Sequence, residues 1–158
     1  MRQCDDLQFG YQAKSSTTMC SWAVTAVIDF YNRNGRPVYG CAMDMSKAFD
    51  MVEWGELFTN LRSKGVNSIF LRLLLSIYRN QQCDVKWGGE FSHRFLVSNG
   101  VRQGTVSSVI FFSLYINELF IILRKAKLGC HVNGEFFGCF GYANDLFLIS
   151  AELVYKLW

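Results

Sequence analysis

Apolar residues recur at helical spacing, at every third or fourth position, in four stretches of the chain. The pattern predicts helices over residues 19–31, 54–62, 68–79 and 106–125. Hydroxyl side chains at residues 16–18 are suitable N-caps for the first helix, and Asn67 is one for the third. The last stretch is the most apolar. Polar residues interrupt it, so we expect a buried helix there and not a membrane span.

Shorter apolar runs bounded by turn residues predict strands. These strands are expected at residues 37–44, 82–87, 91–97, 130–132, 135–140 and 146–149. Gly88-Gly89 and Asn133-Gly134 each separate two of the runs and are typical two-residue hairpin turns. A further hairpin is expected around residues 142–145, a polar tetrapeptide between apolar segments. This order of helices and strands predicts an α+β domain in which helices pack on a small antiparallel sheet.

Composition and charge constrain this picture further. Of the 158 residues, 51% are hydrophobic, which is enough to build a buried core, and no repeat, linker or low-complexity tract divides the chain. The net charge is only +3, but residues 58–127 carry ten Lys or Arg against three Asp or Glu. Such a basic region suits a surface that faces a phosphate backbone, and ordinary solvated helix faces explain it equally well.

The six cysteines of the chain include no CxxC pair and show no zinc-ligand spacing. The N-terminal residues lack the apolar stretch of a secretory signal, so a disulfide framework is not expected. We therefore expect the thiols to be reduced and buried.

Two carboxylates lie at the ends of predicted strands. Asp44 ends the apolar run 38–43, and Asp145 lies at the tip of the hairpin around residues 142–145. Carboxylates that meet across adjacent strands would offer hard oxygen ligands to Mg²⁺. If the two aspartates are considered alone, ordinary structural roles explain them better than metal binding does: a helix cap for Asp44 and a turn residue for Asp145. The functional interpretation therefore depends on the segments that accompany them.

Four segments in this order resemble the reverse transcriptase domain of LINE-type non-LTR retrotransposons. They are residues 7–18, 44–50, 100–104 and 142–145, which resemble the finger segment and the three palm motifs of that family. The resemblance covers nearly the whole chain. It implies an α+β fold with a polymerase palm-type antiparallel sheet, packed helices, partial fingers and no thumb. The chain is then expected to be a single fingers and palm domain over residues 1–158, truncated at the C-terminus.

The resemblance implies an RNA-directed DNA polymerase, a nucleotidyltransferase that adds deoxynucleotides to a primer 3′-end on an RNA template. The chemistry in this family is two-metal phosphoryl transfer with two Mg²⁺ ions. The implied partners are an RNA template, a DNA primer and deoxynucleoside triphosphates, with no membrane. The protein is expected to be intracellular, and a retroelement enzyme has to reach chromosomal DNA in the nucleus.

By resemblance, Asp44 and Asp145 are the catalytic metal ligands. The family has two adjacent aspartates in its third palm motif, where this chain has Asn144 and then Asp145. An amide presents one neutral oxygen and an NH₂ group that repels a cation, so Asn144 removes a charge and a bridging ligand. Two interpretations follow: a polymerase impaired at this position, or an inactive palm relic with at most nucleic-acid binding. A structural module for protein partners is a third, with no specific residue in its favour.

Four further residues take nucleotide-binding roles by resemblance. Phe49 stands where the family has an aromatic gate under the incoming sugar, and a core phenylalanine is the ordinary alternative. Gln103 and Gly104 would line the nucleotide and template pocket, where a glycine permits close approach of another backbone. Arg102 is a candidate phosphate contact, and a surface arginine is an equally good explanation.

Overall fold

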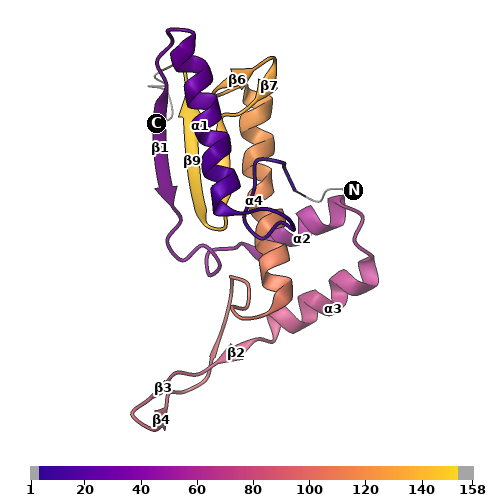
Figure 1. Cartoon of the computed structure of the whole chain (residues 1–158). Helices are drawn as coiled ribbons and strands as arrows, with labels where there is room; N and C mark the ends of the chain where they lie inside the picture. Colours follow the sequence, from indigo (N-terminus) through magenta and orange to yellow (C-terminus); the bar gives the residue numbers. More distant parts are fainter. Residues whose placement is uncertain (1–3, 153–158) are drawn as a thin grey trace. The chain divides into compact units, whose positions relative to one another are not determined.

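The computed structural model of the chain describes residues 4–152 (Figure 1). These residues divide into two units. The first unit comprises residues 4–48 and 116–152, and the second comprises residues 49–115. One long helix, α4 (Val106–Ala126), contributes its first half to the second unit and its second half to the first.

The first unit is built on a three-stranded antiparallel sheet. Its strands are β1 (Tyr39–Asp44), β8 (Cys139–Tyr142) and β9 (Asp145–Ser150), in the order β1-β9-β8. β8 is buried except at its last residue, whereas all six residues of β1 are exposed. The predicted combination of helices with an antiparallel sheet is confirmed, although β1 begins two residues later than expected.

The helix α1 (Thr17–Arg33) contacts β8 of this sheet. Its N-cap is Ser16, whose hydroxyl accepts a hydrogen bond from the Met19 backbone N–H at 3.2 Å, as the sequence predicts. Near the other end, the Tyr31 hydroxyl donates to the His131 carbonyl oxygen at 2.8 Å and accepts from the His131 N–H at 2.9 Å. These bonds anchor the helix to the segment that precedes β8.

The N-terminal segment extends the sheet beyond β8. Gln8 forms a parallel bridge with Gly141. In this bridge the Phe9 N–H donates to the Gly141 oxygen at 2.7 Å, and the Gly141 N–H donates to the Leu7 oxygen at 2.9 Å. At Gly141, β8 is therefore hydrogen-bonded on both edges, to β9 on one side and to the N-terminal segment on the other.

A short hairpin at the expected Asn-Gly turn consists of β6 (His131–Val132) and β7 (Glu135–Phe136). The prediction of one strand over residues 135–140 is wrong, because β7 ends early and β8 begins only after a break. At the break, a Cβ atom added to Gly129 would overlap the Cα atom of Gly138. A backbone contact of this kind needs glycine, and an apolar run in the sequence does not reveal it.

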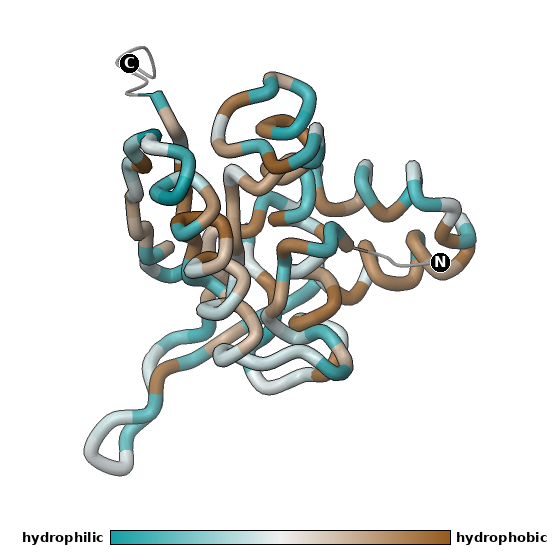
Figure 2. Tube along the Cα trace, turned by 45° about the horizontal axis from the view of Figure 1, so that its top comes forward, coloured by the Kyte–Doolittle hydropathy of each residue, from teal (hydrophilic) through white to brown (hydrophobic). Residues whose placement is uncertain are grey.

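The second unit contains two helices, a long hairpin and the first half of α4. The helices are α2 (Trp54–Ser63) and α3 (Ser68–Arg79), and Asn67 caps α3 by accepting from the Ile69 N–H at 2.8 Å. The hairpin strands are β2 (Gln82–Cys83), β3 (Lys86–Trp87), β4 (Glu90–Phe91) and β5 (Phe95–Leu96), which pair as β2–β5 and β3–β4. In Figure 1 and Figure 2 the hairpin is the arm that extends away from the helices of its unit.

Among residues 4–152, α4 is the one helix long and apolar enough to cross a membrane, judged by length and composition only. Part of it faces the core, because Phe120 is fully buried whereas Ile122 is 60% exposed. Its last turn is held by Arg124, whose Nη2 atom lies 2.8 Å from Asp5 Oδ2 in a partly buried ion pair. The expected buried helix is therefore observed along one face.

All six cysteines are free, and Cys130 and Cys139 are the buried ones. The expectation of buried thiols is wrong for Cys41 on β1, which is exposed, and Cys4, Cys20 and Cys83 are only partly buried. β1 is exposed on its whole length, so an apolar run in the sequence does not guarantee burial there.

The two kinds of cysteine are expected to react differently. Burial, with a smaller contribution from Asp5, raises the pKa of the Cys139 thiol to about 12. Only the thiolate is nucleophilic, so we expect iodoacetamide to label exposed Cys41 in the native protein and Cys139 only after unfolding in urea. Mass spectrometry of the labelled peptides measures both rates. Equal rates for the two thiols in the native protein would contradict the burial of β8.

Candidate functional site

The pairing of β1 with β9 places Asp44 opposite Asp145. The register runs from Tyr39 opposite Ser150 to this pair at the other end of the two strands. Directly opposed residues of an antiparallel pair have Cβ atoms about 4.5–5.5 Å apart and share one face of the sheet. Both aspartates are exposed. The two carboxylates singled out in the sequence therefore lie side by side at one end of the sheet.

A tight turn between β8 and β9 positions Asp145. Tyr142 pairs with Asp145, so Ala143 and Asn144 form the turn. Ala143 has a φ of +58°, a left-handed value that costs a residue with a side chain about 1–2 kcal/mol. The Asn144 carbonyl oxygen accepts a hydrogen bond from the Met45 N–H at 3.3 Å. This bond links the turn to the end of β1.

The Asn144 side chain forms a hydrogen bond with the Asp44 carboxylate. Its Nδ2 atom donates to Asp44 Oδ1 at 3.1 Å. An N–H group that points at this oxygen occupies a lone pair that a metal ion would otherwise use. No group of three or more His, Cys, Asp or Glu side chains in the described part of the chain could hold a metal ion. The site thus consists of two carboxylates and an amide.

Gly10 lies against the backbone of the turn, a contact that the sequence patterns did not predict. A Cβ atom added to Gly10 would overlap the Ala143 nitrogen and lie 2.9 Å from the carbonyl carbon of Tyr142. Only glycine fits at such a distance from another backbone. The sequence contains one signal, a glycine that ends an apolar segment, but that signal does not identify the partner far along the chain.

The four residues expected to bind the nucleotide all lie in the second unit. Gln103 Nε2 donates to Asp50 Oδ1 at 3.1 Å, and Arg102 Nε donates to Gln81 Oε1 at 3.0 Å. Burial raises the pKa of the Tyr78 phenol, and the nearby Arg102 guanidinium partly opposes this shift. Gln103 and Arg102 thus connect the loop before α4 to two separate segments of the unit.

Phe49 and Gly104 are the other two residues expected to bind the nucleotide. Phe49 is half-buried and stacks on the buried ring of Phe112, with the ring centroids 4.7 Å apart and an interplanar angle of 19°. Gly104 has a φ of +85°, and a Cβ atom added there would meet nothing within 4 Å. Gly104 is needed for its backbone conformation.

Backbone hydrogen bonds at Gly100 and Val101 connect the motif segment 100–104 to the end of the motif segment 44–50. The Gly100 N–H donates to the Val52 oxygen at 2.8 Å, and the next N–H, from Val101, donates to the Phe49 oxygen at 2.8 Å. Gly100 has a φ of +86°, and an added Cβ atom would lie 2.9 Å from the Cα atom of Asp50. The structure therefore brings the end of the first motif segment against the start of the second through backbone contacts.

A protein-family model matches almost the whole chain. The family is described as reverse transcriptase (RNA-dependent DNA polymerase), and the match covers residues 1–154. The chain is 25% identical over 146 residues to the retrovirus-related Pol polyprotein of the type-2 retrotransposable element R2DM from Drosophila melanogaster. It is 24% identical over 110 residues to the polyprotein of the type-1 retrotransposable element R2 from Popillia japonica. These alignments cover 92% and 69% of this chain but only 14% and 18% of the two polyproteins.

Solved structures of telomerase have a similar fold. The structure of telomerase from Candida albicans, in complex with the TWJ fragment of telomeric RNA, gives a TM-score of 0.64 at 17% identity, over 87% of this chain and 27% of that chain. Apo telomerase from Candida tropicalis, truncated from its C-terminal domain, gives 0.61 at 20% identity, over 87% of this chain and 29% of that chain. At these identities the likeness concerns the fold alone.

Proposed function

Because this chain belongs to the reverse transcriptase (RNA-dependent DNA polymerase) family, we propose that it extends a primer 3′-end with deoxynucleotides on an RNA template. It is a reverse transcriptase domain of the LINE-type retroelement class. The ligands we propose are an RNA template, a DNA primer and deoxynucleoside triphosphates. We also propose that its two units belong to one fingers and palm domain, which acts inside the cell where chromosomal DNA is accessible.

The pairing of Asp44 with Asp145 is the observation that carries this proposal. Two exposed carboxylates on one face of a sheet offer several oxygen atoms to a hard cation. Mg²⁺ is usually held by one or two carboxylates together with substrate phosphates, so this donor set fits one Mg²⁺ ion. A second ion would need a further carboxylate, and Asn144 stands where the resemblance places it.

When bound, a Mg²⁺ ion would favour loss of the proton from the attacking hydroxyl and stabilise charge on the transferred phosphoryl group. The chain itself supplies the positions of the ligands. Asp44 and Asp145 are fixed by the β1–β9 register, and Gly10 supports the turn that leads into Asp145. Such fixing matters, because a displacement of about 1 Å at a reacting centre can cost about a hundredfold in rate.

For the second unit we propose that Arg102 binds phosphate, that Gln103 and Gly104 line the nucleotide and template pocket, and that Phe49 lies under the sugar. Arginine offers a planar pair of donors to a phosphate group. The hydrogen bond from Gln103 to Asp50 supports a fixed position for the glutamine side chain. Stacking on the buried ring of Phe112 supports a fixed position for the Phe49 ring. A ring held in this way would clash with a 2′-hydroxyl and favour deoxynucleotides.

We further propose that Asn144 impairs catalysis in this chain. The hydrogen bond from Asn144 to Asp44 supports this, because it places a donor where a cation requires an acceptor. Loss of a bridging carboxylate is expected to cost several kcal/mol of transition-state stabilisation, and each ~1.4 kcal/mol is a factor of ten in rate. The same hydrogen bond supports the second candidate function, an inactive palm relic that retains at most nucleic-acid binding.

Primer extension tests the proposed function. The chain is incubated with an RNA template annealed to a DNA primer, with deoxynucleotides and either Mg²⁺ or Mn²⁺. We expect slow extension that Asp44→Asn abolishes, because that change removes one of the two remaining ligand charges. Asp29→Asn, at an exposed position on α1, is the matched control and is expected to leave extension unchanged.

Each outcome separates the two candidate functions. Extension that survives Asp44→Asn would contradict the metal-ligand role of Asp44. If neither the native chain nor Asn144→Asp extends the primer, while circular dichroism shows both to be folded, the inactive relic is favoured.

A further inference from the structure

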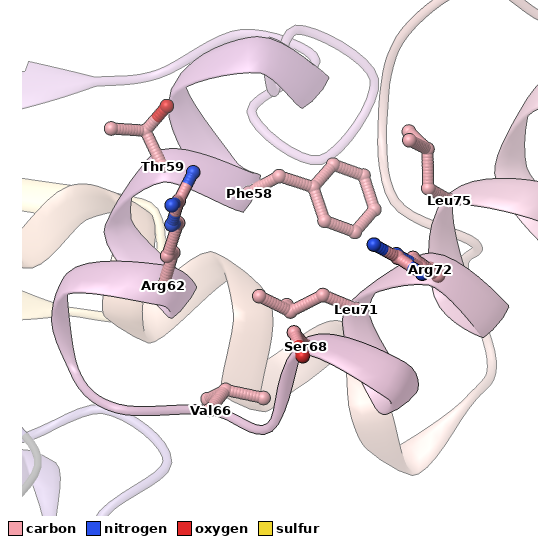
Figure 3. Close-up of a pocket in the computed structure, with 8 residues that line it drawn as sticks. All are labelled: Phe58, Thr59, Arg62, Val66, Ser68, Leu71, Arg72 and Leu75. Carbon is pink, nitrogen blue, oxygen red and sulfur yellow. The ribbon is translucent and has the colours of Figure 1, made fainter.

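An open pocket lies between α2 and α3, inside the second unit (Figure 3). Its volume is about 380 Å³. Half-buried Phe58, Val66, Leu71 and Leu75 form an apolar floor. Exposed Arg62 of α2 and Arg72 of α3 lie at its rim. None of the residues assigned above to metal or nucleotide binding lines this pocket. It is therefore a separate candidate for a ligand.

The rim of the pocket carries positive charge. Within residues 4–152, neither Arg62 nor Arg72 has an ion-pair or hydrogen-bond partner for its side chain, and no acidic residue lines the pocket. Residues 54–79, which include both helices, carry four Lys or Arg and one Glu. Figure 3 shows the two guanidinium groups on opposite sides of the pocket. This arrangement suits a ligand with an apolar centre and a negative charge on each side.

The aromatic ring of the floor is held in place. Figure 3 shows Phe58 reaching from α2 toward Leu75 of α3. The buried ring of Tyr78 contacts Phe58 edge-on, with centroids 6.0 Å apart and an interplanar angle of 87°. A ring that is already fixed can stack on a planar ligand at a low cost in conformational entropy. The pocket therefore offers a preformed surface for a flat group.

We propose that this pocket takes one base of a single-stranded nucleic acid, and that Arg62 and Arg72 bind the phosphates on either side of that base. The proposal rests on the proposed function, because it assumes that nucleic acid is the ligand of the chain. It adds a contact with the strand that the motif residues do not provide. Stacking of bases on aromatic rings, combined with neutralisation of the backbone charge, is the general mode by which proteins hold single strands.

An acidic helical peptide is the other ligand that arginines beside an apolar groove would attract, and the size of the pocket disfavours it. A peptide helix is about 10–12 Å across and anchors itself through several side chains at positions i, i+3 or i+4 and i+7. The pocket of about 380 Å³ has one apolar floor, to which only four apolar side chains contribute, those of Phe58, Val66, Leu71 and Leu75. One planar group with a phosphate at each rim arginine matches this arrangement.

The first test measures binding to a fluorescein-labelled single-stranded RNA of about 12 nucleotides by fluorescence anisotropy, without primer, nucleotide or divalent cation. The double variant Arg62→Gln/Arg72→Gln is compared with Arg36→Gln/Arg79→Gln, which removes two charges from exposed positions outside the pocket. We expect the pocket variant to bind at least about tenfold more weakly. The slope of log affinity against log salt concentration should also be smaller in magnitude by about 1.4 for this variant. This is the value of about 1.4 for two phosphate contacts on a single strand.

The second test asks whether the pocket binds a base. An abasic strand of the same length keeps the charge and lacks the bases, and we expect the native chain to bind it about five- to a hundredfold more weakly. Phe58→Leu keeps an apolar floor without the ring and is expected to lose most of this preference. Circular dichroism establishes that each variant is folded.

Three results would overturn the proposal. They are equal losses in the two double variants, equal affinity for the abasic and base-bearing strands, and tighter binding of an acidic amphipathic peptide than of RNA. These assays involve no catalysis, so a failure here is distinguishable from a failure of the proposed polymerase function. Conversely, if the chain does not extend a primer but binds RNA through this pocket, the inference stands although the polymerase proposal fails.

Discussion

The variant Asn144→Asp is expected to bind Mn²⁺ at least about tenfold more tightly than the native chain, a difference of about 1.4 kcal/mol. In the native chain, the Asn144 amide donates to Asp44 Oδ1 at 3.1 Å. The substitution replaces this donor with a carboxylate, which adds both a charge and a ligand for a hard cation. Titration of the electron paramagnetic resonance signal of free Mn²⁺ measures the affinity.

The same substitution is expected to lower stability in the absence of metal. It removes the hydrogen bond to Asp44 and places a further carboxylate beside Asp44 and Asp145, which together cost about 1 kcal/mol. A cation that binds only the folded state recovers this stability by RT ln(1 + [L]/Kd). The Tm of the variant should therefore rise with Mn²⁺ concentration more steeply than that of the native chain.

Asn133→Asp is the matched control for this experiment. It adds the same charge in the turn between β6 and β7, where Asp-Gly is as suitable as Asn-Gly. We expect its Mn²⁺ affinity and its Tm to follow those of the native chain. Equal Mn²⁺ affinity in Asn144→Asp and the native chain would contradict the assignment of this turn as a metal site.

Gly10→Ala is expected to destabilise the folded chain by about 3 kcal/mol or more. The added methyl group would overlap the Ala143 nitrogen and lie 2.8 Å from the Ala143 Cα atom. Overpacking costs about 1–3 kcal/mol when side chains can move, and here the obstructing atoms belong to the backbone of a tight turn. Urea unfolding followed by circular dichroism measures the loss.

Gly55→Ala in α2 is the control for this loss. A Cβ atom added there meets nothing within 4 Å, and alanine is favoured over glycine in a helix, so we expect a gain of about 0.5–1 kcal/mol. In the double variant Gly10→Ala/Asn144→Asp, Mn²⁺ binding should fall back toward the native level, because the turn is displaced. Native stability in Gly10→Ala would show that the N-terminal segment does not support the turn.

Local signals in the sequence predicted the helices closely. α3 spans the predicted residues 68–79, and Asn67 caps it as expected. α2 and α4 each extend one residue beyond the predicted end. Helix ends depend on caps and on the spacing of apolar residues over a few positions, so the neighbouring sequence contains the necessary information.

Strand ends were harder to predict. The strand expected over residues 135–140 is interrupted because Gly138 packs against the backbone of Gly129. The result there depends on what lies near the glycine in space, and the adjacent residues do not specify it.

By itself, the sequence determined the α+β class, the helices and the order of the motif segments, because spacing and capping act over a few neighbouring residues. Only the tertiary structure decided that Asp44 pairs with Asp145, that Asn144 bonds to Asp44, and that Gly10 lies against the turn. These contacts join segments a hundred residues or more apart along the chain. A slip of one residue in the register would turn every side chain of the strand to the other face, so the packing of the whole sheet sets the site.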